Sequence, residues 1–542
     1  MKRRLLLAAV LAAFSCTQVP VDSGQDPPVG PDPDPVLPKA LVVSARVDGK
    51  AVPASGKMGG VSLSPVISVE FTHEVEADEA SLEAVRFDGG AMTVAVNPAD
   101  ATVLDFRPVA ALEPLHSYRF ELAEGAGFGI TLKKGYSFSF VTSVDESADK
   151  FPRIADEELL TLVQEQTFRY FWDYAHPVSG LARERLGSDN TVTSGGSGFG
   201  IMTLPVAVER GFISRADAAE RMRRILSFLQ AAERFHGAFP HWLDGSTGKV
   251  IPFSANDNGG DLVETAFLMQ GLLTAAQYFD EAAEEDIRTG VRALWEGVEW
   301  DWYTRGQQQL YWHWSPSAEW AMNMPVRGWN EALIVYVLAA SSPTHPVSAD
   351  VYHKGWASDG SMKPTQNGPL FFAHYSFLGL DPRKLSDRYG NYWEQNVAHA
   401  RYNYDYCVRN PKRHAGYSAR SWGLSASDYP GGYTASSPAN DHGTIAPTAA
   451  LASFPYTPEE SLQALHYFYY VLGDKLWGEF GFRDAFCLDE SWVASSYLAI
   501  DQGPVVVMIE NHRSGLLWNL FMKNADVQRG LKKLGFEENK KF

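Results

Sequence analysis

Three carboxylates stand close together at the start of one apolar run. Asp257, Asp261 and Glu264 fall in the stretch Ser254 to Leu273, SANDNGGDLVETAFLMQGLL. Asp261 and Glu264 are three positions apart, so on a helix their side chains would share a face and could point into one cavity. Acids grouped in this way suggest proton transfer.

The same residues also fit a purely structural role. An Asp followed three residues later by a Glu, after two glycines and before an apolar run, has the form of a helix capping box. In isolation, capping is the more common explanation of such a pattern. The rest of the chain has to decide between a cap and a catalytic group.

A fourth acid opens the next apolar segment. Glu331 ends the stretch PVRGWNE that begins at Pro325. Alone, Glu331 could simply complement a helix dipole. Together with the first group it supplies acids from two helices, as glycoside hydrolysis requires: a protonated carboxyl donates to the leaving oxygen, and a carboxylate activates water or attacks carbon. Neighbouring acids and partial burial would separate the two pKa values.

Several loops combine aromatic rings with hydrogen-bonding side chains, as sugar sites do. They are GAFPHWL, YWHW, RHAGYSARSW, Gly431 to Tyr433 and DHGT. Each loop alone is more often structural, but their concentration between helical segments favours a sugar site. The predicted substrate-binding residues are His241, Trp242, Trp314, Arg327, Trp329, Tyr417, Arg420, Tyr433 and His442.

Metal and nucleophile motifs are weak or missing. The sequence has no HExxH, CxxC or GxSxG pattern, and GGSGFG at Gly195 to Gly200 matches neither the dinucleotide nor the P-loop spacing. Asp257-Asn258-Gly259 is similar to part of a calcium loop, but the spacing that follows is wrong for an EF-hand. We therefore expect no metal and no cofactor.

Composition indicates a folded protein that does not bind nucleic acid. The chain has 542 residues, 45% of them hydrophobic and 13% aromatic, enough for a large core. Its formal charge of -18 argues against nucleic acid, because phosphate binding needs clustered Lys and Arg. We expect a monomer.

The first residues predict export. Residues 1–16, MKRRLLLAAVLAAFSC, have a basic start and an apolar run too short to span a bilayer in the mature protein. The end AFSC resembles a bacterial lipobox, so we expect lipidation of Cys16, a lipid anchor in the outer membrane, and a place in the periplasm or at the cell surface. A secreted protein with an incidental cysteine is the alternative. Cys407 and Cys487 could form one bridge and receive no function.

Residues 17–38 are rich in Pro and Asp and predict an extended spacer. Over residues 39–145 short alternating runs separated by turn residues predict a small all-β sandwich. The segment SPVISVEFTHEV resembles bacterial Ig-like domains, and we expect a spacer or docking module. The predicted strands are Leu41 to Val47, Val66 to Phe71, Ala91 to Val96, Thr102 to Phe106, Tyr118 to Leu122 and Tyr136 to Val141.

Helical periodicity dominates residues 150–542. This length is too great for a simple bundle, and no fixed repeat indicates a solenoid, so we expect a mainly α fold with helical hairpins closed into an (α/α) toroid. The predicted helical ranges are Ile154 to Tyr174, Ser214 to Phe235, Asp261 to Phe279, Glu284 to Trp300, Glu331 to Ala340, Tyr389 to Val408, Pro458 to Leu472, Ala494 to Glu510 and Leu516 to Leu534.

From Ile154 to Phe536 the chain resembles the bacterial glucoamylase-like domain, and specifically glycoside hydrolase family 144, the endo-β-1,2-glucanases. The blocks that carry the resemblance are FRYFWDYAHPVSGLARER, TSGGSGFGIM, NDNGGDLVETAFLMQGLL, RGWNEALIVYVLAASSPTHPV, FFAHYSFLGLDPR, NDHGTIAPTAA and IDQGPVVVMIENHRSGLLW.

This resemblance implies an (α/α)6 barrel, no cofactor, and anomer-inverting cleavage of β-1,2-glucan to sophorooligosaccharides. It also implies that Asp257, Asp261, Glu264 and Glu331 line the catalytic pocket. Our working assignment makes Glu331 the general acid and Asp261 the water-activating base, with Glu264 and Asp257 tuning it. Inversion would require the two working carboxyls to lie roughly 6.5 to 9.5 Å apart.

Other functions stay open from the sequence. An exo-acting or other-linkage glucan hydrolase could use the same fold, since fold does not determine substrate. A non-catalytic glycan-binding lipoprotein is a second alternative, although all the acids are present. A polysaccharide lyase would need groups such as Tyr417, Arg420 and His442, and nothing else in the sequence supports it.

Overall fold

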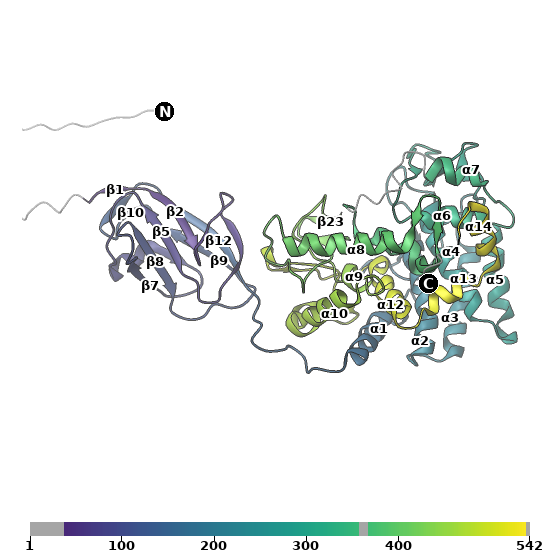
Figure 1. Cartoon of the computed structure of the whole chain (residues 1–542), viewed down its shortest axis with the longest axis horizontal. Coiled ribbons are helices and arrows are strands. Elements are labelled where there is room, and N and C mark those ends of the chain that lie inside the picture. Colours follow the sequence, from purple (N-terminus) through teal and green to yellow (C-terminus); the bar gives the residue numbers. More distant parts are fainter. Residues whose placement is uncertain (1–36, 357–366, 538–542) are drawn as a thin grey trace, which may run out of the picture.

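The computed structural model describes residues 37–356 and 367–537. An all-β part comes first and a mainly helical part follows it, as predicted (Figure 1). The predicted leader, Cys16 and nearly all of the spacer lie outside the described residues.

The all-β part contains each of the six predicted strands and several shorter ones. A five-stranded sheet has the order β3-β2-β5-β8-β7, a four-stranded sheet has the order β4-β12-β9-β6, and a small sheet has the order β1-β11-β10. The strands are β1 Lys39–Ala40, β2 Val42–Val47, β3 Lys50–Ala51, β4 Lys57–Val61, β5 Ile67–Phe71, β6 Val85–Phe87, β7 Met92–Val96, β8 Val103–Pro108, β9 Ser117–Leu122, β10 Gly125–Gly127, β11 Ile130–Leu132 and β12 Tyr136–Thr142.

The two larger sheets share one hydrophobic core. Alternate residues of β5, Ile67, Val69 and Phe71, are buried, as the two-residue period of a strand with one covered face requires. Phe106 of one sheet contacts Phe120 of the other, with ring centroids 5.2 Å apart. The sheets therefore pack face to face.

Every predicted helical range contains a helix. The last predicted range divides into α13 and α14, because the Asn524 side chain caps a new helix. The helices are α1 Asp156–Trp172, α2 Ser194–Glu209, α3 Arg215–Ala231, α4 Leu262–Tyr278, α5 Glu285–Glu296, α6 Leu333–Ser341, α7 Ala349–Val351, α8 Tyr392–Arg409, α9 Pro447–Leu451, α10 Pro458–His466, α11 Gly473–Leu476, α12 Ala499–Arg513, α13 Leu516–Met522 and α14 Ala525–Leu534.

Helix α2 was not predicted, because four of its first seven residues are glycines and Pro205 lies inside it, and both residue types disfavour helices. Nearly all of its residues are also buried, so it has no polar face that would produce a helical period. Its glycines bring α2 close to α4: a Cβ on Gly198 would lie 2.2 Å from the Phe267 carbonyl oxygen, and a Cβ on Gly271 would lie 2.1 Å from the Gly198 oxygen. The glycines of GGSGFG serve helix packing.

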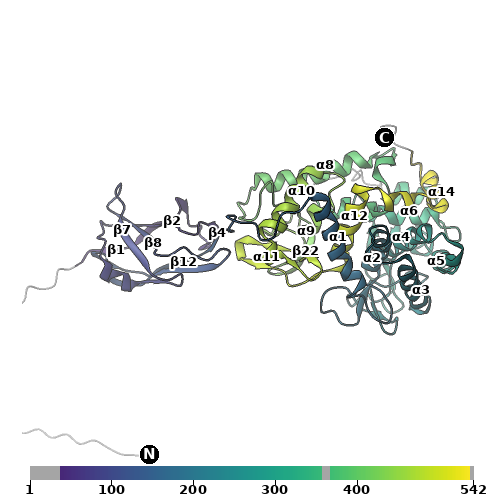
Figure 2. The same cartoon turned by 90° about the horizontal axis from the view of Figure 1, so that it is seen from below.

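Helix α4 is the centre of the helical part. It is buried along almost its whole length and contacts α2, α5, α6 and α13. Helix α12 contacts both α1 and α2, so late segments of the chain return to the early ones (Figure 2). No helix in residues 37–356 and 367–537 has the length and apolar character needed to cross a bilayer.

The all-β part and the junction after it contact the helical part through polar groups and through Leu115 and Val144, which pack against the helical core. Lys57 of β4 pairs with Glu490 at 3.5 Å, and Arg420 pairs with Glu146 at 2.8 Å. The Ser491 hydroxyl donates a hydrogen bond to the Leu115 carbonyl oxygen. Elsewhere in the helical part, Cys407 and Cys487 are both buried and form no bridge.

Candidate active site

Asp261 is the N-cap of α4. Its Oδ1 accepts hydrogen bonds from the backbone N–H groups of Val263 and Glu264, each at 2.9 Å. Glu264 does not complete a capping box, because its Oε2 accepts from the N–H of Gly195 at 2.7 Å and from the Thr193 hydroxyl at 3.4 Å. Asp261 therefore caps the helix, while the Glu264 carboxylate is directed toward α2 and takes no part in the cap.

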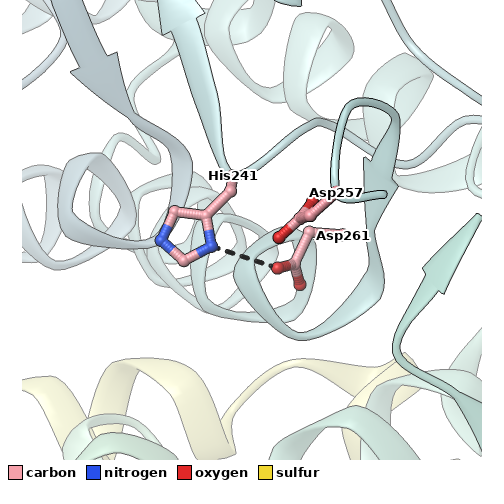
Figure 3. Close-up of side chains that lie close together, drawn as sticks. All are labelled: His241, Asp257 and Asp261. Carbon is pink, nitrogen blue, oxygen red and sulfur yellow. Dashed lines mark hydrogen bonds and ion pairs between the residues drawn. The ribbon is translucent and has the colours of Figure 1, made fainter. Parts of the chain in front are cut away.

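A short ribbon brings a histidine against the aspartates. Strand β16 (Gly260–Asp261) pairs with β18 (His313–Trp314), with Asp261 opposite His313. His313 Nε2 lies 3.0 Å from Asp257 Oδ2 and 3.2 Å from Asp261 Oδ2. His241 Nδ1 also lies 3.2 Å from Asp261 Oδ2 (Figure 3).

These contacts make Asp261 an ionised, fully engaged carboxylate. Burial acts to raise its pKa, but the charges of His313 and His241 and their hydrogen bonds outweigh it and hold the pKa well below its usual range. Burial lowers the pKa of both histidines, yet the carboxylates raise that of His313 to about 10 and that of His241 to about 9. Both imidazoles are therefore cations at neutral pH.

Glu264 and Glu331 face a common cavity of about 400 Å³, whereas Asp257 and Asp261 do not line it. Three of the predicted substrate-binding residues line it as well: His241, Trp242 and Tyr433. Phe253 stacks on His241 with ring centroids 4.2 Å apart and half of its surface exposed, so it supplies an aromatic face within this wall. The cavity has the mixture of rings and a few polar groups that is typical of a ligand site.

Glu331 precedes α6 by two residues and is half-buried in the cavity wall. Burial, together with the charges of Glu264 and Asp261, raises the pKa of Glu331 to about 7. Burial and the Asp261 charge also raise the pKa of Glu264, while the charge of His241 opposes this. A carboxyl that titrates near neutral pH, as Glu331 does, beside a second buried carboxyl is suited to proton transfer.

The other predicted substrate-binding residues are not among those that line this cavity. The Tyr417 hydroxyl donates to Asp441, Arg420 pairs with Glu146, and His442 contacts Asn440. Trp329 is buried against Phe372 and His399, and Arg327 is exposed. Trp314 packs against His236 and Trp302. Their sequence context resembled a sugar site, but four of them, Trp314, Trp329, Tyr417 and Arg420, contact residues outside the cavity lining.

Several residues of the cavity wall were not predicted from the sequence. Glu184 and Arg185 belong to the quoted block ending LARER, and Tyr375 belongs to FFAHYSFLGLDPR, but neither block had a spacing that assigns a role. The remaining missed members are Thr193, Phe253, Phe267, Trp312, Phe371, Ala426, Leu498 and Ile500.

Behind Tyr375 lies a buried pair of acids. Asp484 and Asp501 hydrogen-bond to each other, and the Tyr375 hydroxyl donates to Asp501 Oδ1 at 3.4 Å. Asp484 Oδ2 accepts from the N–H of Asp428 at 2.7 Å. Burial, aided by the Asp428 charge, raises the pKa of Asp484 to about 7, and burial beside Asp484 raises that of Asp501. The pair therefore holds at least one proton at neutral pH.

The geometry does not favour a metal ion. Ligand atoms of His241, Asp257 and Asp261 lie within 4.8 Å of one another (Figure 3). The charged Nε2–H group of His313 already bridges Asp257 and Asp261, and Asp261 Oδ1 is engaged by backbone N–H groups. A cation would have to compete with an imidazolium ion for the same oxygens, so these residues do not fit a metal.

Comparison with known proteins identifies the helical part. A family model described as "Putative glucoamylase" matches residues 323–525. An endo-β-1,2-glucanase structure from Chitinophaga pinensis, in complex with sophorotriose and glucose, is 52% identical, with a TM-score of 0.70 over 71% of this chain and 99% of that one. The chain belongs to glycoside hydrolase family 144. The resemblance noted in the sequence is thus confirmed.

Two other similar proteins come from Parabacteroides distasonis. An exo β-1,2-glucooligosaccharide sophorohydrolase (non-reducing end) is 47% identical over 426 residues, which is 72% of this chain. The match spans 59% of that relative's length. A β-1,2-glucanase crystal structure is 37% identical, with a TM-score of 0.69, and the match covers 92% of this chain and 73% of that one.

Replacing Asp484 with Asn should change how stability depends on pH. The pKa of Asp484 is higher in the folded chain than in the unfolded chain. Its protonated form therefore contributes stability that is fully present below the unfolded-state pKa of 3.8 and is lost as pH rises through about 7. Asn stays neutral, so we expect the variant to gain stability relative to the natural chain between pH 4 and 7, by up to about 1.4 kcal/mol per pH unit. Thermal unfolding at several pH values measures this; a constant difference between the two proteins would contradict a shared proton.

Proposed function

We propose that this chain is a glycoside hydrolase that cleaves β-1,2-glucan. The observation that carries the proposal is that Glu264 and Glu331 face one aromatic-walled cavity, in a chain whose relatives include an endo-β-1,2-glucanase and an exo-acting sophorohydrolase. Glycoside hydrolysis requires two carboxyl groups, and aromatic rings beside them can stack on the sugar. No cofactor enters the proposed mechanism.

We assign the general acid to Glu331 and the water-activating base to Glu264. A pKa of about 7 keeps a protonated fraction of Glu331 at neutral pH, while the Gly195 N–H and the His241 cation favour the ionised form of Glu264. The charge of Glu264 also raises the pKa of Glu331, which favours the proton on Glu331 when Glu264 is ionised. Glu331 would protonate the leaving oxygen and Glu264 would take a proton from the attacking water.

This assignment revises the role of Asp261. The sequence suggested it as the base, but both of its oxygens are engaged and it is fully buried. Asp261 instead positions Glu264, which follows it by one turn of α4. Asp257 supports His313 and contributes indirectly.

We also propose the (α/α)6 barrel as the arrangement of the helices. Its support is the chain of helix contacts from α1 through α12, α2 and α4 to α6, and the fold that the family resemblance implies. In such a barrel the buried helices α2 and α4 would be inner helices, and their N-terminal ends would present Glu264 and the Thr193 region to the cavity.

Endo action is the favoured mode. The C. pinensis endo-glucanase is matched over 99% of its length, whereas 59% of the sophorohydrolase is matched. An exo-acting enzyme is the alternative, because that relative also shares 47% identity.

Product analysis on purified β-1,2-glucan tests the substrate and the mode together. We expect a mixture of sophorooligosaccharides from the earliest time points, with inversion at the anomeric carbon, and no products from starch or laminarin. Chromatography gives the product lengths and NMR gives the anomer. Sophorose as the sole early product would favour exo action, and no release from β-1,2-glucan would overturn the proposal.

The Glu331→Gln variant tests the general acid. Gln cannot donate a proton, so kcat/KM should fall by about 10²- to 10⁴-fold. In the natural enzyme Glu331 is protonated below its pKa, so activity should fall as pH rises through about 7. Steady-state kinetics across pH measures both effects, with Glu220→Gln on the surface of α3 as the control. An unchanged alkaline limb in the variant would assign the titration to another group.

We further propose that the chain is an exported lipoprotein anchored through Cys16, in the periplasm or at the cell surface. The support is the leader sequence, its lipobox-like end and the acidic, proline-rich spacer behind it. In a bacterial host the natural chain should fractionate with membranes and the Cys16→Ala variant should not. Equal membrane association of both would contradict lipidation.

A further inference from the structure

A second cleft, of about 680 Å³, lies outside the proposed catalytic cavity and shares none of its lining residues. Two tryptophans, Trp302 and Trp320, contribute to its walls with their ring centroids 6.4 Å apart, and Arg305, Glu299 and Asp301 line it as well. Trp302 is 40% exposed, which is unusual for so large an apolar side chain. Exposed rings bordered by polar groups mark a binding surface rather than a core.

The ring of Trp302 is held in a fixed orientation. His236 stacks on it with ring centroids 3.7 Å apart and an interplanar angle of 14°, and Trp314 meets it edge-on. His236 has a φ of +51°, a conformation that costs energy in a residue with a side chain. Glu299 secures it twice, through a 2.8 Å contact from Oε2 to His236 Nδ1 and a 3.0 Å hydrogen bond from its N–H to the His236 carbonyl.

Trp320 is fixed in a similar way. The Arg305 guanidinium lies over the Trp320 ring, 5.2 Å from its centroid, and over Tyr311 at 4.6 Å. Arg305 also donates to Asn323 at 2.8 Å. Both rings are thus oriented before any ligand arrives, which reduces the entropy lost on binding.

The polar groups of the cleft suit hydroxyl groups. Asp301 uses Oδ1 for His345 and for the N–H of Trp302, and Glu299 uses Oε2 for His236. Within the part of the chain that the structure describes, no hydrogen bond reaches Asp301 Oδ2 or Glu299 Oε1, which leaves two acceptors for donors from a ligand. Carboxylates near an arginine leave little net charge, and the acids repel phosphate. A neutral sugar chain combines stackable faces with hydroxyl donors.

The cleft is connected to the proposed active site through β18. Successive side chains of a strand point to opposite faces. His313 accordingly points to Asp257 and Asp261, while Trp314 points to His236 and Trp302. The β16–β18 ribbon therefore contacts the acid cluster (Asp257 and Asp261) on one side and the tryptophan platform (the rings of Trp302 and Trp320) on the other.

From this geometry we propose that the Trp302–Trp320 cleft is a second glucan-binding site, which holds a segment of β-1,2-glucan outside the catalytic cavity. The inference rests on the proposed function. The Trp302–Trp320 cleft would raise the affinity for long glucan chains, because it would hold one segment of a chain while another segment occupies the catalytic cavity.

Calorimetric titration of the full chain carrying Glu331→Gln, which slows hydrolysis, tests the second site. Sophorotriose should bind at two sites per chain, and the added Trp302→Ala change should leave one. The affinity for long β-1,2-glucan should fall by about tenfold, the value of losing one stacked ring. Trp302→Phe, which keeps a smaller ring, should recover part of the loss.

Two further variants separate binding from folding. Asp301→Asn keeps an acceptor for the Trp302 N–H and should weaken the second site without lowering the unfolding temperature. Trp172→Ala, at a half-buried tryptophan that stacks on Phe168 away from both cavities, should leave both sites intact. Unchanged stoichiometry and glucan affinity in a folded Trp302→Ala chain would overturn the second site. If the natural chain hydrolyses no β-1,2-glucan, the proposed function itself fails.

Discussion

The carboxylate of Asp261 is the constraint on which the site depends. It is buried without solvent contact, so its charge has to be compensated by donors supplied by the protein. Oδ1 takes the first N–H groups of α4, and Oδ2 takes His241 and His313. One side chain thereby joins the start of the central helix, the residue preceding strand β14 (Trp242–Asp244), and the ribbon strand β18.

This arrangement also determines which acids are available to a substrate. Because Asp261 takes the capping role, Glu264 is free to turn toward α2, where the Gly195 N–H stabilises one of its oxygens. The charge on Asp261 is then felt by Glu331, whose pKa it helps to raise. An acid that does not line the cavity thus raises the pKa values of the two that do.

The limits of sequence-based prediction follow from the same contacts. Most of the predicted strands and helices have an exposed face that gives a period, and the buried helices α4 and α6 could be predicted from apolar runs with few helix-breaking residues. Helix α2 could not, since four glycines and Pro205 interrupt its apolar residues. The acids could be found because Asp257, Asp261 and Glu264 are close in sequence. The pairing of Asp484 with Asp501 and the bridge from His313 depend on tertiary contacts that no local spacing records.

The aromatic residues show the same limit more sharply. Trp242 and Trp314 both stood in loops that resembled sugar sites, yet one lines the cavity and the other supports a separate cleft. The difference arises from strand alternation: His313 and Trp314 are neighbours in the chain but face opposite sides of a two-stranded ribbon. Any shift of β18 by one residue would exchange the two side chains, leaving Asp261 without a cation and Trp302 without its edge contact. The pairing of β16 with β18 therefore has to be exact for the acid cluster and the tryptophan platform alike.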